Sequence, residues 1–390
     1  MQREMKKENK KTTKTTKTTK SSKQASEKKI TFFGVLRDTV MVLINLAVVL
    51  LLLLSAKLPI LSPEQLTIAA YPNYLLLFFA VVNILFFLYW LFRLRYWAVM
   101  SLLAFVICFQ EQKDWFPLHV DQEDVSLSKK EYKLLTYNTM RFSSMKPHSA
   151  QSPNKVLKYL QDSQADIICL QEANCHTSSK YLQSEDVLRA MSAYPYQRVL
   201  PGKKVLNMWV FSKYPIIKCE RIPFESFANA SYYCDIKIDG KIIRVINNHL
   251  ESNKLNQADK TIYKDIIDKP DKESISHVAT HLNGKLAPAA VLRAKQAEAV
   301  ARVIEESPYP VIVCGDLNDI PNSYTYRQMS KGLEDAWVNN ANGLGITYHE
   351  HFFLFRIDYI LHSPSIKTYQ TQVDKVSHSD HYPLWTYFQL

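Results

Sequence analysis

Apolar positions come first in long unbroken runs and later in short periodic ones. Residues 40–56 are apolar apart from Asn45 and Ser55, residues 74–92 are rich in Leu and Phe, and residues 97–109 form a shorter run. Stretches of this length and composition are typical of membrane-spanning helices. We therefore expect transmembrane helices at about residues 36–56, 74–92 and 94–110. The alternatives are a signal peptide for the first and an interfacial or buried segment for the third.

Beyond residue 112 the hydrophobic pattern changes to that of a folded domain. Residues 113–129 are polar and acidic and indicate a linker. From residue 130 to the C-terminus, short β-branched runs alternate with amphipathic helical stretches, which is typical of an α/β domain. The strands are expected at 132–137, 166–170, 208–211, 231–238, 241–247, 310–315 and 355–361, and the helices at 156–161, 255–276 and 290–306.

Positive charge is concentrated at the N-terminus. Residues 1–34 form a basic tail, and its first 30 residues hold 11 Lys or Arg and three Glu, a charge of +8, which leaves +3 of the chain's +11 for the remainder. We expect a disordered cytoplasmic tail, because its first 30 residues are mostly Lys and Thr with few hydrophobic residues, and because basic flanks face the cytoplasm. Arg93 and Arg95 place the turn after the second helix on the same side. Three spans then put the large domain on the outer or periplasmic face of the cell (inner) membrane, whereas two would leave it in the cytoplasm.

The six cysteines lack the spacing of a metal site or a disulfide framework. Cys108 lies in an apolar run, and Cys169 and Cys314 lie in expected core strands. Buried thiols are the interpretation we favour. One disulfide among Cys175, Cys219 and Cys234 would require an oxidising compartment.

Polar residues follow the expected strands of the large domain at the points where they end. Any one of these polar residues has a purely structural explanation, such as a turn, the start of a helix or a partly buried histidine with its hydrogen bonds made within the fold. The residues are Asn138, Glu172, His249, the pair Asp316 and Asn318, and the pair Asp380 and His381, while Asp358 is expected inside its strand. Phosphodiester hydrolysis needs such groups, because it requires a metal for the phosphate charge, a base for the water and donors for the leaving oxygen.

Six segments containing these residues occur in the order found in one enzyme family. They are YNTMRF, DIICLQEA, NNHLES, VIVCGDLND, RIDYIL and SDHYPL. Residues 130–390 resemble the endonuclease/exonuclease/phosphatase superfamily, and the apolar N-terminus is similar to a membrane-anchored bacterial branch of it. The resemblance implies a DNase I-like α/β/β/α sandwich.

The same resemblance implies a role for each matching residue. Asn138, Glu172 and Asp380 would hold Mg²⁺, with Mn²⁺ as a substitute. Asp316 and Asn318 would position or deprotonate the attacking water. His249 and His381 would contact the phosphate or leaving group, and Asp358 would pair with His381. Arg141, Asn207 and Glu251 are candidates for substrate contact, although the segment before Trp209 departs from the family pattern and Glu251 is a single residue shared with tyrosyl-DNA phosphodiesterases.

We therefore expect a membrane-anchored, Mg²⁺-dependent phosphoesterase, most of all a phosphodiesterase. The substrate is a nucleic acid, a phospholipid or a small phosphodiester, and the loops at 146–154 and 252–288 determine which. The near-neutral domain disfavours tight binding to nucleic acid. The alternatives are a lipid or sugar phosphodiesterase or phosphatase at the membrane surface, and a tethered binding module without catalysis. We expect the bilayer as a partner through the N-terminal helices, and no protein partner.

Overall fold

The computed structural model describes residues 32–120, 130–143, 148–149, 151–175, 178, 180–201, 207–226, 228–253, 272–350 and 354–390. The expected basic tail, most of the expected linker, the start of the 255–276 helix and part of the 146–154 loop lie outside these ranges. The chain divides into two compact units, Met1–Val48 and Val49–Leu390. The first helix begins in the first unit, and all later elements belong to the second.

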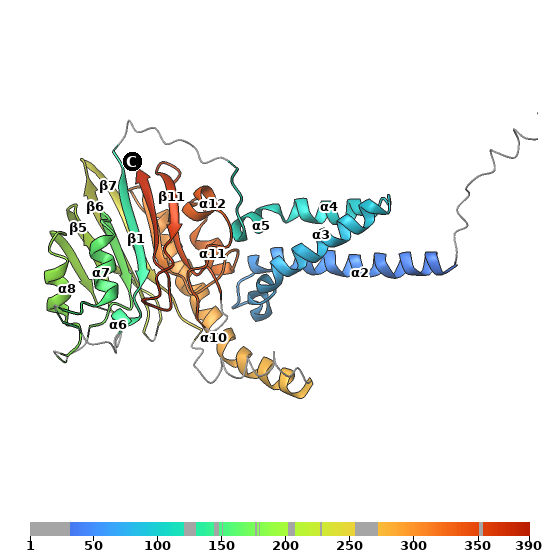
Figure 1. Ribbon diagram of the computed structural model, residues 1–390, viewed down its shortest axis with the longest axis horizontal. Coiled ribbons are helices and arrows are strands. Elements are labelled where there is room, and N and C mark those ends of the chain that lie inside the picture. The colour runs from blue at the N-terminus through green and yellow to red at the C-terminus, as the bar shows by residue number, and fades with distance from the viewer. Residues whose placement is uncertain are drawn as a thin grey trace, which may run out of the picture. The chain divides into compact units, whose positions relative to one another are not determined.

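The N-terminal part is helical. Its α-helices are α2 (Phe32–Lys57), α3 (Leu76–Phe92), α4 (Ala98–Ile107) and α5 (Phe109–Trp115), and the turns η1 (Leu58–Ile60), η2 (Thr67–Ala70) and η3 (Pro72–Leu75) join α2 to α3. Within the described ranges, two helical stretches are long and apolar enough to cross a membrane, Phe33–Ile60 and Thr67–Phe92, whereas α4 is shorter. α4 packs along α3, where the buried Asn83 amide donates to the Ser101 carbonyl at 2.9 Å (Figure 1).

Over the residues that the structure describes, the large domain contains two six-stranded sheets, which Figure 1 shows packed together. The first has the order β11-β12-β1-β2-β4-β3 and the second β5-β6-β7-β8-β10-β9. The strands are β1 (Tyr132–Asn138), β2 (Ile167–Gln171), β3 (Tyr196–Leu200), β4 (Met208–Ser212), β5 (Ile216–Ile222), β6 (Ala230–Ile238), β7 (Lys241–His249), β8 (Val311–Asp316), β9 (Glu334–Asp335), β10 (Asp358–His362), β11 (Lys367–Val373) and β12 (Leu384–Gln389). The helices are α6 (Met140–Ser143), α7 (Lys155–Asp162), α8 (Ser184–Ala190), α10 (Lys272–Glu305), α11 (Tyr324–Met329) and α12 (Ala336–Asn340).

The two sheets pack face to face, and helices cover their outer faces. The central core joins β1 and β2 residues such as Leu134 and Ile167 to β7 and β8 residues such as Val245 and Ile312. A second core packs the first sheet on α7 and α8, and a third packs the second sheet on α10 and α11. Strands buried on both faces read as continuous apolar runs, which is why their sequence identified them. The expected α/β/β/α sandwich is confirmed.

Each sheet contains one parallel pair at its centre, β1 with β2 and β7 with β8. The C-terminal ends of these four strands therefore lie at one end of the sandwich. Strands β10 and β12 run antiparallel to β8 and β1, so they begin at that same end. Residues that end the first four strands and residues that begin the last two are thus brought together.

Four expectations need correction. Asp358 begins β10 rather than lying inside it, because the ladder with β8 starts at the pair Asp358–Asp316, whereas Phe355 pairs with Tyr348 instead. Residues 109–115, assigned in part to the linker, form the buried helix α5. The two expected helices between 255 and 306 are, over the described residues, the single helix α10, which continues through Pro288. Cys219 and Cys234, opposite each other on β5 and β6, form a disulfide.

Candidate active site

The centre of the site is the end of β8. Val311, Ile312 and Val313 are buried, and Gly315 has a φ of +115°, which disfavours a side chain. A Cβ built on Gly315 would lie 2.2 Å from the Asn248 carbonyl oxygen on β7. Glycine therefore allows β7 and β8 to pair to their ends, where His249 lies beside Asp316 in the parallel register.

The Asp316 carboxylate accepts three hydrogen bonds from amide groups of Asn138 and Asn318. Its Oδ2 accepts from the Asn138 Nδ2 at 3.0 Å and from the Asn318 Nδ2 at 3.3 Å, and its Oδ1 accepts from the Asn318 backbone N–H at 2.8 Å. Asn318, with a φ of +52°, also donates to the Leu250 carbonyl at 2.9 Å, which ties the loop after β8 to the loop after β7. Burial raises the pKa of Asp316 to about 6, although His381 and His249 act in the opposite direction.

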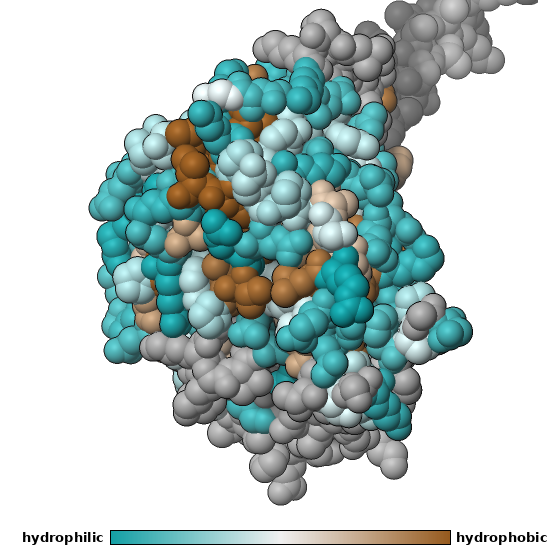
Figure 2. Space-filling model, turned by 90° about the vertical axis from the view of Figure 1, so that its left-hand side faces the viewer, coloured by the Kyte–Doolittle hydropathy of each residue, from teal (hydrophilic) through white to brown (hydrophobic). Residues whose placement is uncertain are grey.

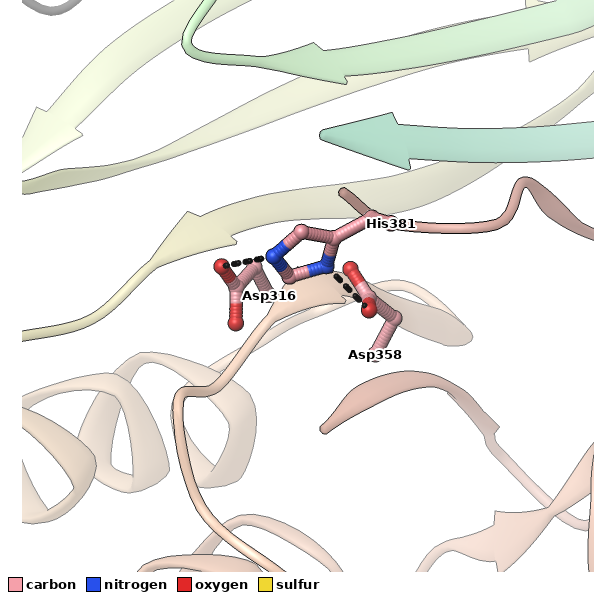
Figure 3. Close-up of side chains that lie close together, drawn as sticks. All are labelled: Asp316, Asp358 and His381. Atoms are coloured by element: carbon pink, nitrogen blue, oxygen red, sulfur yellow. Dashed lines mark hydrogen bonds and ion pairs between the residues drawn. The ribbon is translucent and has the colours of Figure 1, made fainter. Parts of the chain in front are cut away.

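His381 lies between two carboxylates (Figure 3). Its Nδ1 donates to the Asp358 Oδ2 at 2.8 Å, and its Nε2 lies 3.7 Å from the Asp316 Oδ2. Burial alone would lower the pKa of His381, but the charges of Asp358 and Asp316 outweigh it and hold the pKa well above its ordinary value. The two carboxylates therefore favour the cationic form of this imidazole.

Glu172 and His249 form the other half of the site. The His249 Nε2 lies 3.6 Å from the Glu172 Oε1 and 3.8 Å from the Asp316 Oδ2. Burial lowers the pKa of His249, which favours the neutral form of this imidazole. Burial, and after it the charge of Asp380, raises the pKa of Glu172 above its ordinary value.

Asp380 enters the site through its neighbour. The Ser379 hydroxyl lies 2.8 Å from the Asn138 carbonyl oxygen, to which it donates, and 3.1 Å from the Asp380 Oδ1. The segment before β12 is thereby attached to the end of β1. Eight sequence-predicted residues thus converge: Asn138, Glu172, His249, Asp316, Asn318, Asp358, Asp380 and His381.

The three remaining candidates lie at the margin or away from the centre. The Arg141 backbone N–H donates to the Glu172 carbonyl at 2.8 Å, and Asn207 accepts through its carbonyl from Ala173, so both border the loop that carries Glu172. Glu251 is buried and its Oε2 accepts from the Ser226 hydroxyl at 2.8 Å. The substrate contact expected of Glu251 is thus not favoured, because the side chain turns toward the interior behind the loop after β7.

Two residues that support the site were missed from the sequence. The Thr347 hydroxyl accepts from the Ile357 and Asp358 backbone N–H groups, both at 3.1 Å, and so fixes the start of β10. Tyr348 places its ring against the His381 imidazole, with ring centroids 5.1 Å apart. Neither lies at the end of an apolar strand run, so the pattern that found the other residues could not find these.

The site has more negative than positive charge, which suits a cation. Ligand atoms of Asp316, Asp358 and His381 lie within 4.8 Å of one another and could hold a metal ion. Because the two His381 nitrogens face the Asp358 and Asp316 carboxylates, at 2.8 and 3.7 Å, we regard this group as an ion-paired chain and not as a metal site. The partly exposed Glu172 carboxylate, with Asn138 and Asp380 beside it, offers hard oxygen ligands of the kind Mg²⁺ prefers.

Comparison with known proteins agrees with this geometry. Residues 135–381 match the model of the endonuclease/exonuclease/phosphatase family, and residues 38–114 match a domain of unknown function (DUF8431). No curated protein matches the chain.

Similar solved structures include three with low sequence identity. An endonuclease/exonuclease/phosphatase from Beutenbergia cavernae is 15% identical, with a TM-score of 0.46, and the match covers 67% of this chain and 72% of that one. The human Nocturnin catalytic domain with bound sulfate is 15% identical, with a TM-score of 0.45 and coverage of 70% of this chain and 98% of that one. D. rerio TDP2 complexed with single-strand DNA product is 16% identical, with a TM-score of 0.44 and coverage of 67% of this chain and 100% of that one.

The family model covers well over half of the chain, including the strands β1, β2, β7, β8 and β10 and the residues that converge at their ends. The chain belongs to the endonuclease/exonuclease/phosphatase family and is a phosphoester-hydrolysing enzyme.

Proposed function

We propose that the protein is a membrane-anchored, Mg²⁺-dependent phosphodiesterase. The observation that carries the proposal is the convergence of two buried imidazoles and three carboxylates around the end of β8. Phosphodiester hydrolysis needs a base for water and positive charge for the phosphoryl oxygens, and this arrangement provides both.

Glu172, Asn138 and Asp380 would hold the metal ion. When bound, it neutralises phosphate charge and polarises the phosphorus–oxygen bonds. The raised pKa of Glu172 supports this assignment, because a cation beside a partly buried carboxylate offsets the cost of its burial.

Asp316 would orient the attacking water and accept its proton. Its pKa of about 6 lies close to neutrality, where a general base is most effective. Asn318 would hold the water through its Oδ1, since its Nδ2 already donates to Asp316 and to the Leu250 carbonyl, and it would reach a phosphate oxygen only by giving up one of these two hydrogen bonds.

The two histidines would divide the remaining work. His381, kept cationic by Asp358, donates from Nε2 to a phosphoryl oxygen as negative charge develops there. His249, which is neutral, donates to the phosphate or to the departing oxygen.

The reaction class is tested with two chromogenic esters on the full-length protein in detergent. Bis-p-nitrophenyl phosphate is a diester and p-nitrophenyl phosphate a monoester. We expect Mg²⁺-dependent cleavage of the diester and its loss in Asp316→Asn. Asp239→Asn is the matched control, because Asp239 is half-exposed at the β6–β7 turn. Cleavage of the monoester alone, or full activity in Asp316→Asn, would contradict the proposal.

The two long apolar helices support the membrane anchor, and the contacts of the chain between them support its orientation. Residues 58–75 pack on the large domain, since the Asn73 amide donates to the Pro321 carbonyl at 2.5 Å. We infer that the domain lies on the membrane side at which α2 ends, and the positive-inside rule would make this the outer face.

The disulfide Cys219–Cys234 supports the same side independently, because disulfides persist in oxidising compartments. The orientation is tested with sealed membrane vesicles. External protease should cut the large domain in right-side-out vesicles and spare it in inside-out vesicles. The reverse pattern would place the domain in the cytoplasm.

A further inference from the structure

The loop after β8, residues 317–322, carries part of the active site and leads to α11. Its first half is held by the large domain. The Leu317 backbone N–H donates to the Ile357 carbonyl at 2.9 Å. The Asp319 carbonyl accepts from the Tyr359 hydroxyl, also at 2.9 Å. These contacts fix the loop where it leaves the sheet.

The second half of the loop is attached to residues 49–115, here called the helical part. The Asn73 Nδ2 donates to the Pro321 carbonyl at 2.5 Å. The Asn322 Nδ2 donates to the Glu111 carbonyl at 2.7 Å. The two asparagines are 1% and 2% exposed, so water does not compete for these hydrogen bonds. Two buried amides thus join the loop to segments that lie outside the large domain.

Asn73 is itself fixed from the other side. It lies in η3, directly before α3, and its Oδ1 accepts from the Trp115 indole of α5 at 3.2 Å. The indole can only donate, so it determines which end of the amide faces α5 and directs the Nδ2 toward Pro321. Asn73 therefore holds the loop at a defined position with respect to η3 and α5.

The helix that follows the loop is attached to the helical part as well. The Arg327 Nε of α11 donates to the Asn322 carbonyl at 3.0 Å. The Arg327 Nη2 donates to the Ala56 carbonyl at 2.9 Å and lies 3.3 Å from the Glu111 Oε1. The end of the loop is thus enclosed by contacts that lead back to α2 and α5.

Apolar packing reinforces these hydrogen bonds. Ile320 of the loop and Ile357, which precedes β10, belong to one hydrophobic cluster with Leu52 of α2, Leu76 of α3 and Trp115 of α5. By contrast, the face of the large domain in Figure 2 is mostly hydrophilic, with separate hydrophobic patches. The loop therefore has a buried apolar surface on its helical side, and this surface depends on the helical part for its burial.

The backbone of the loop needs contacts of this kind. Asn318 has a φ of +52° and Asn322 a φ of +63°. Asparagine adopts this left-handed region more readily than other residues with a side chain, but still at a cost, and such a conformation persists where the surroundings determine it. Asn318 is held by Asp316 and by the Leu250 carbonyl, whereas Asn322 is held by the helical part and α11. Loss of the second set would let the loop relax and Asn318 shift.

We propose that Asn73 is a positioning residue of the active site, which holds the loop after β8 so that Asn318 meets the attacking water. The inference rests on the role of Asn318 in the proposed function. The helical part then completes the site in addition to anchoring the chain.

The test compares two buried asparagines of the helical part in the full-length protein in detergent. Asn73→Ala removes the hydrogen bond to the loop. Asn83→Ala is the matched control, because Asn83 is also 1% exposed and donates to a backbone carbonyl, but that of Ser101 in α4. The rates are measured with bis-p-nitrophenyl phosphate and Mg²⁺, below the melting temperature of every variant.

Asn73→Ala should change kcat and not KM, because Asn318 would hold the water and not the ester. A displacement of about 1 Å can cost about 100-fold in rate, so we expect kcat to fall at least about tenfold and KM to stay within about twofold. Asn83→Ala should leave both near their wild-type values. A wild-type kcat in folded Asn73→Ala, or an equal fall in Asn83→Ala, would overturn the inference.

A double-mutant cycle with Asn318→Gly tests the route, since glycine tolerates the positive φ. If Asn73 acts through Asn318, Asn73→Ala should change kcat less than about twofold in the Asn318→Gly background, because the two residues are then coupled. A general loss of structure would lower kcat by the same factor in both backgrounds. The same factor in both would therefore overturn the inference.

Asn322→Gly tests the loop from its own side. It removes the donor to the Glu111 carbonyl, and glycine again tolerates the φ of +63°. We expect the same fall in kcat, and if Asn73→Ala does not fold, a wild-type kcat in Asn322→Gly overturns the inference. A wild type that cleaves the diester while these variants match it refutes the inference alone. A wild type that cleaves no phosphoester refutes the proposed function, and the inference with it.

Discussion

Replacing Asp358 with Asn tests whether His381 acts as a cation. The substitution keeps the size and hydrogen-bonding reach of the side chain but removes the charge that lies 2.8 Å from the His381 Nδ1. The two side chains are 5% and 2% exposed, so solvent screens their interaction little. A charged hydrogen bond of this kind contributes about 1.5–3 kcal/mol, and about 1.4 kcal/mol corresponds to one pKa unit. We therefore expect the pKa of His381 to fall by about one to two units.

The sign of this shift determines the expected pH profile. Because the pKa of His381 is raised, its cationic form is present below that pKa and is lost as the pH rises through it. If the cation is required, activity falls on the alkaline side, and in Asp358→Asn this alkaline limb moves to lower pH by about one to two units.

The assay is kcat/KM for bis-p-nitrophenyl phosphate as a function of pH, for the wild type, Asp358→Asn and the surface control Asp239→Asn. The control should reproduce the wild-type limb. An alkaline limb that stays in place in Asp358→Asn, whatever happens to the maximal rate, would refute the assignment of His381 as the cationic donor.

Three further predictions concern the metal ligand, the base and the disulfide. Glu172→Gln should raise the Mg²⁺ concentration needed for half-maximal activity at least about 100-fold, since even changes to residues behind the metal ligands cost about 10–100-fold. The control Glu334→Gln, at an exposed position, should leave that concentration unchanged. Equal Mg²⁺ titrations for Glu172→Gln and the wild type would contradict a ligand role. Because burial raises the pKa of Asp316 to about 6, its basic form is lost as the pH falls, and kcat/KM should drop about tenfold per unit below that value; a profile flat through this range would exclude Asp316 as the base. Replacing Cys219 and Cys234 together with Ser should lower stability by about 3 kcal/mol for a loop of this length, seen as a lower Tm that a reductant no longer changes; an unchanged Tm would mean that the bond contributes nothing.

The sequence predicted the centre of the site because its signals are local. Buried strands read as apolar runs, and in an α/β sandwich the ends of parallel strands meet, so Asn138, Glu172, His249 and Asp316 could be expected together. The resemblance to the family then supplied their chemistry. The motif RIDYIL identified Asp358 correctly, but its place in the strand was wrong. The pairing of β10 with β8 decides where the strand begins, and the sequence does not show that pairing.

Features that depend on contacts distant in sequence could not be predicted. The sequence predicted a linker from residue 113, inside α5, because the polar residues of this helix are buried only by partners elsewhere, as when the Lys57 and Arg327 side chains both approach the Glu111 Oε1. The Cys219–Cys234 pair has no motif spacing and follows only from the register of β5 on β6.

The burial of α5, and of residues 58–75 between α2 and α3, against the large domain has a practical consequence for protein engineering. Asn73, Asp114 and Trp115 lie outside residues 130–390, yet they form part of the interface with the large domain. The buried Arg356, which pairs with Asp335 at 2.6 Å, also donates to the Asp114 carbonyl at 2.5 Å. Excising the large domain as a soluble fragment would bare this interface, including the apolar side chains of Ile320 and Ile357 next to the active-site loops. Crystallisation, inhibitor screening and kinetic work should therefore begin from the whole chain in a bilayer mimetic.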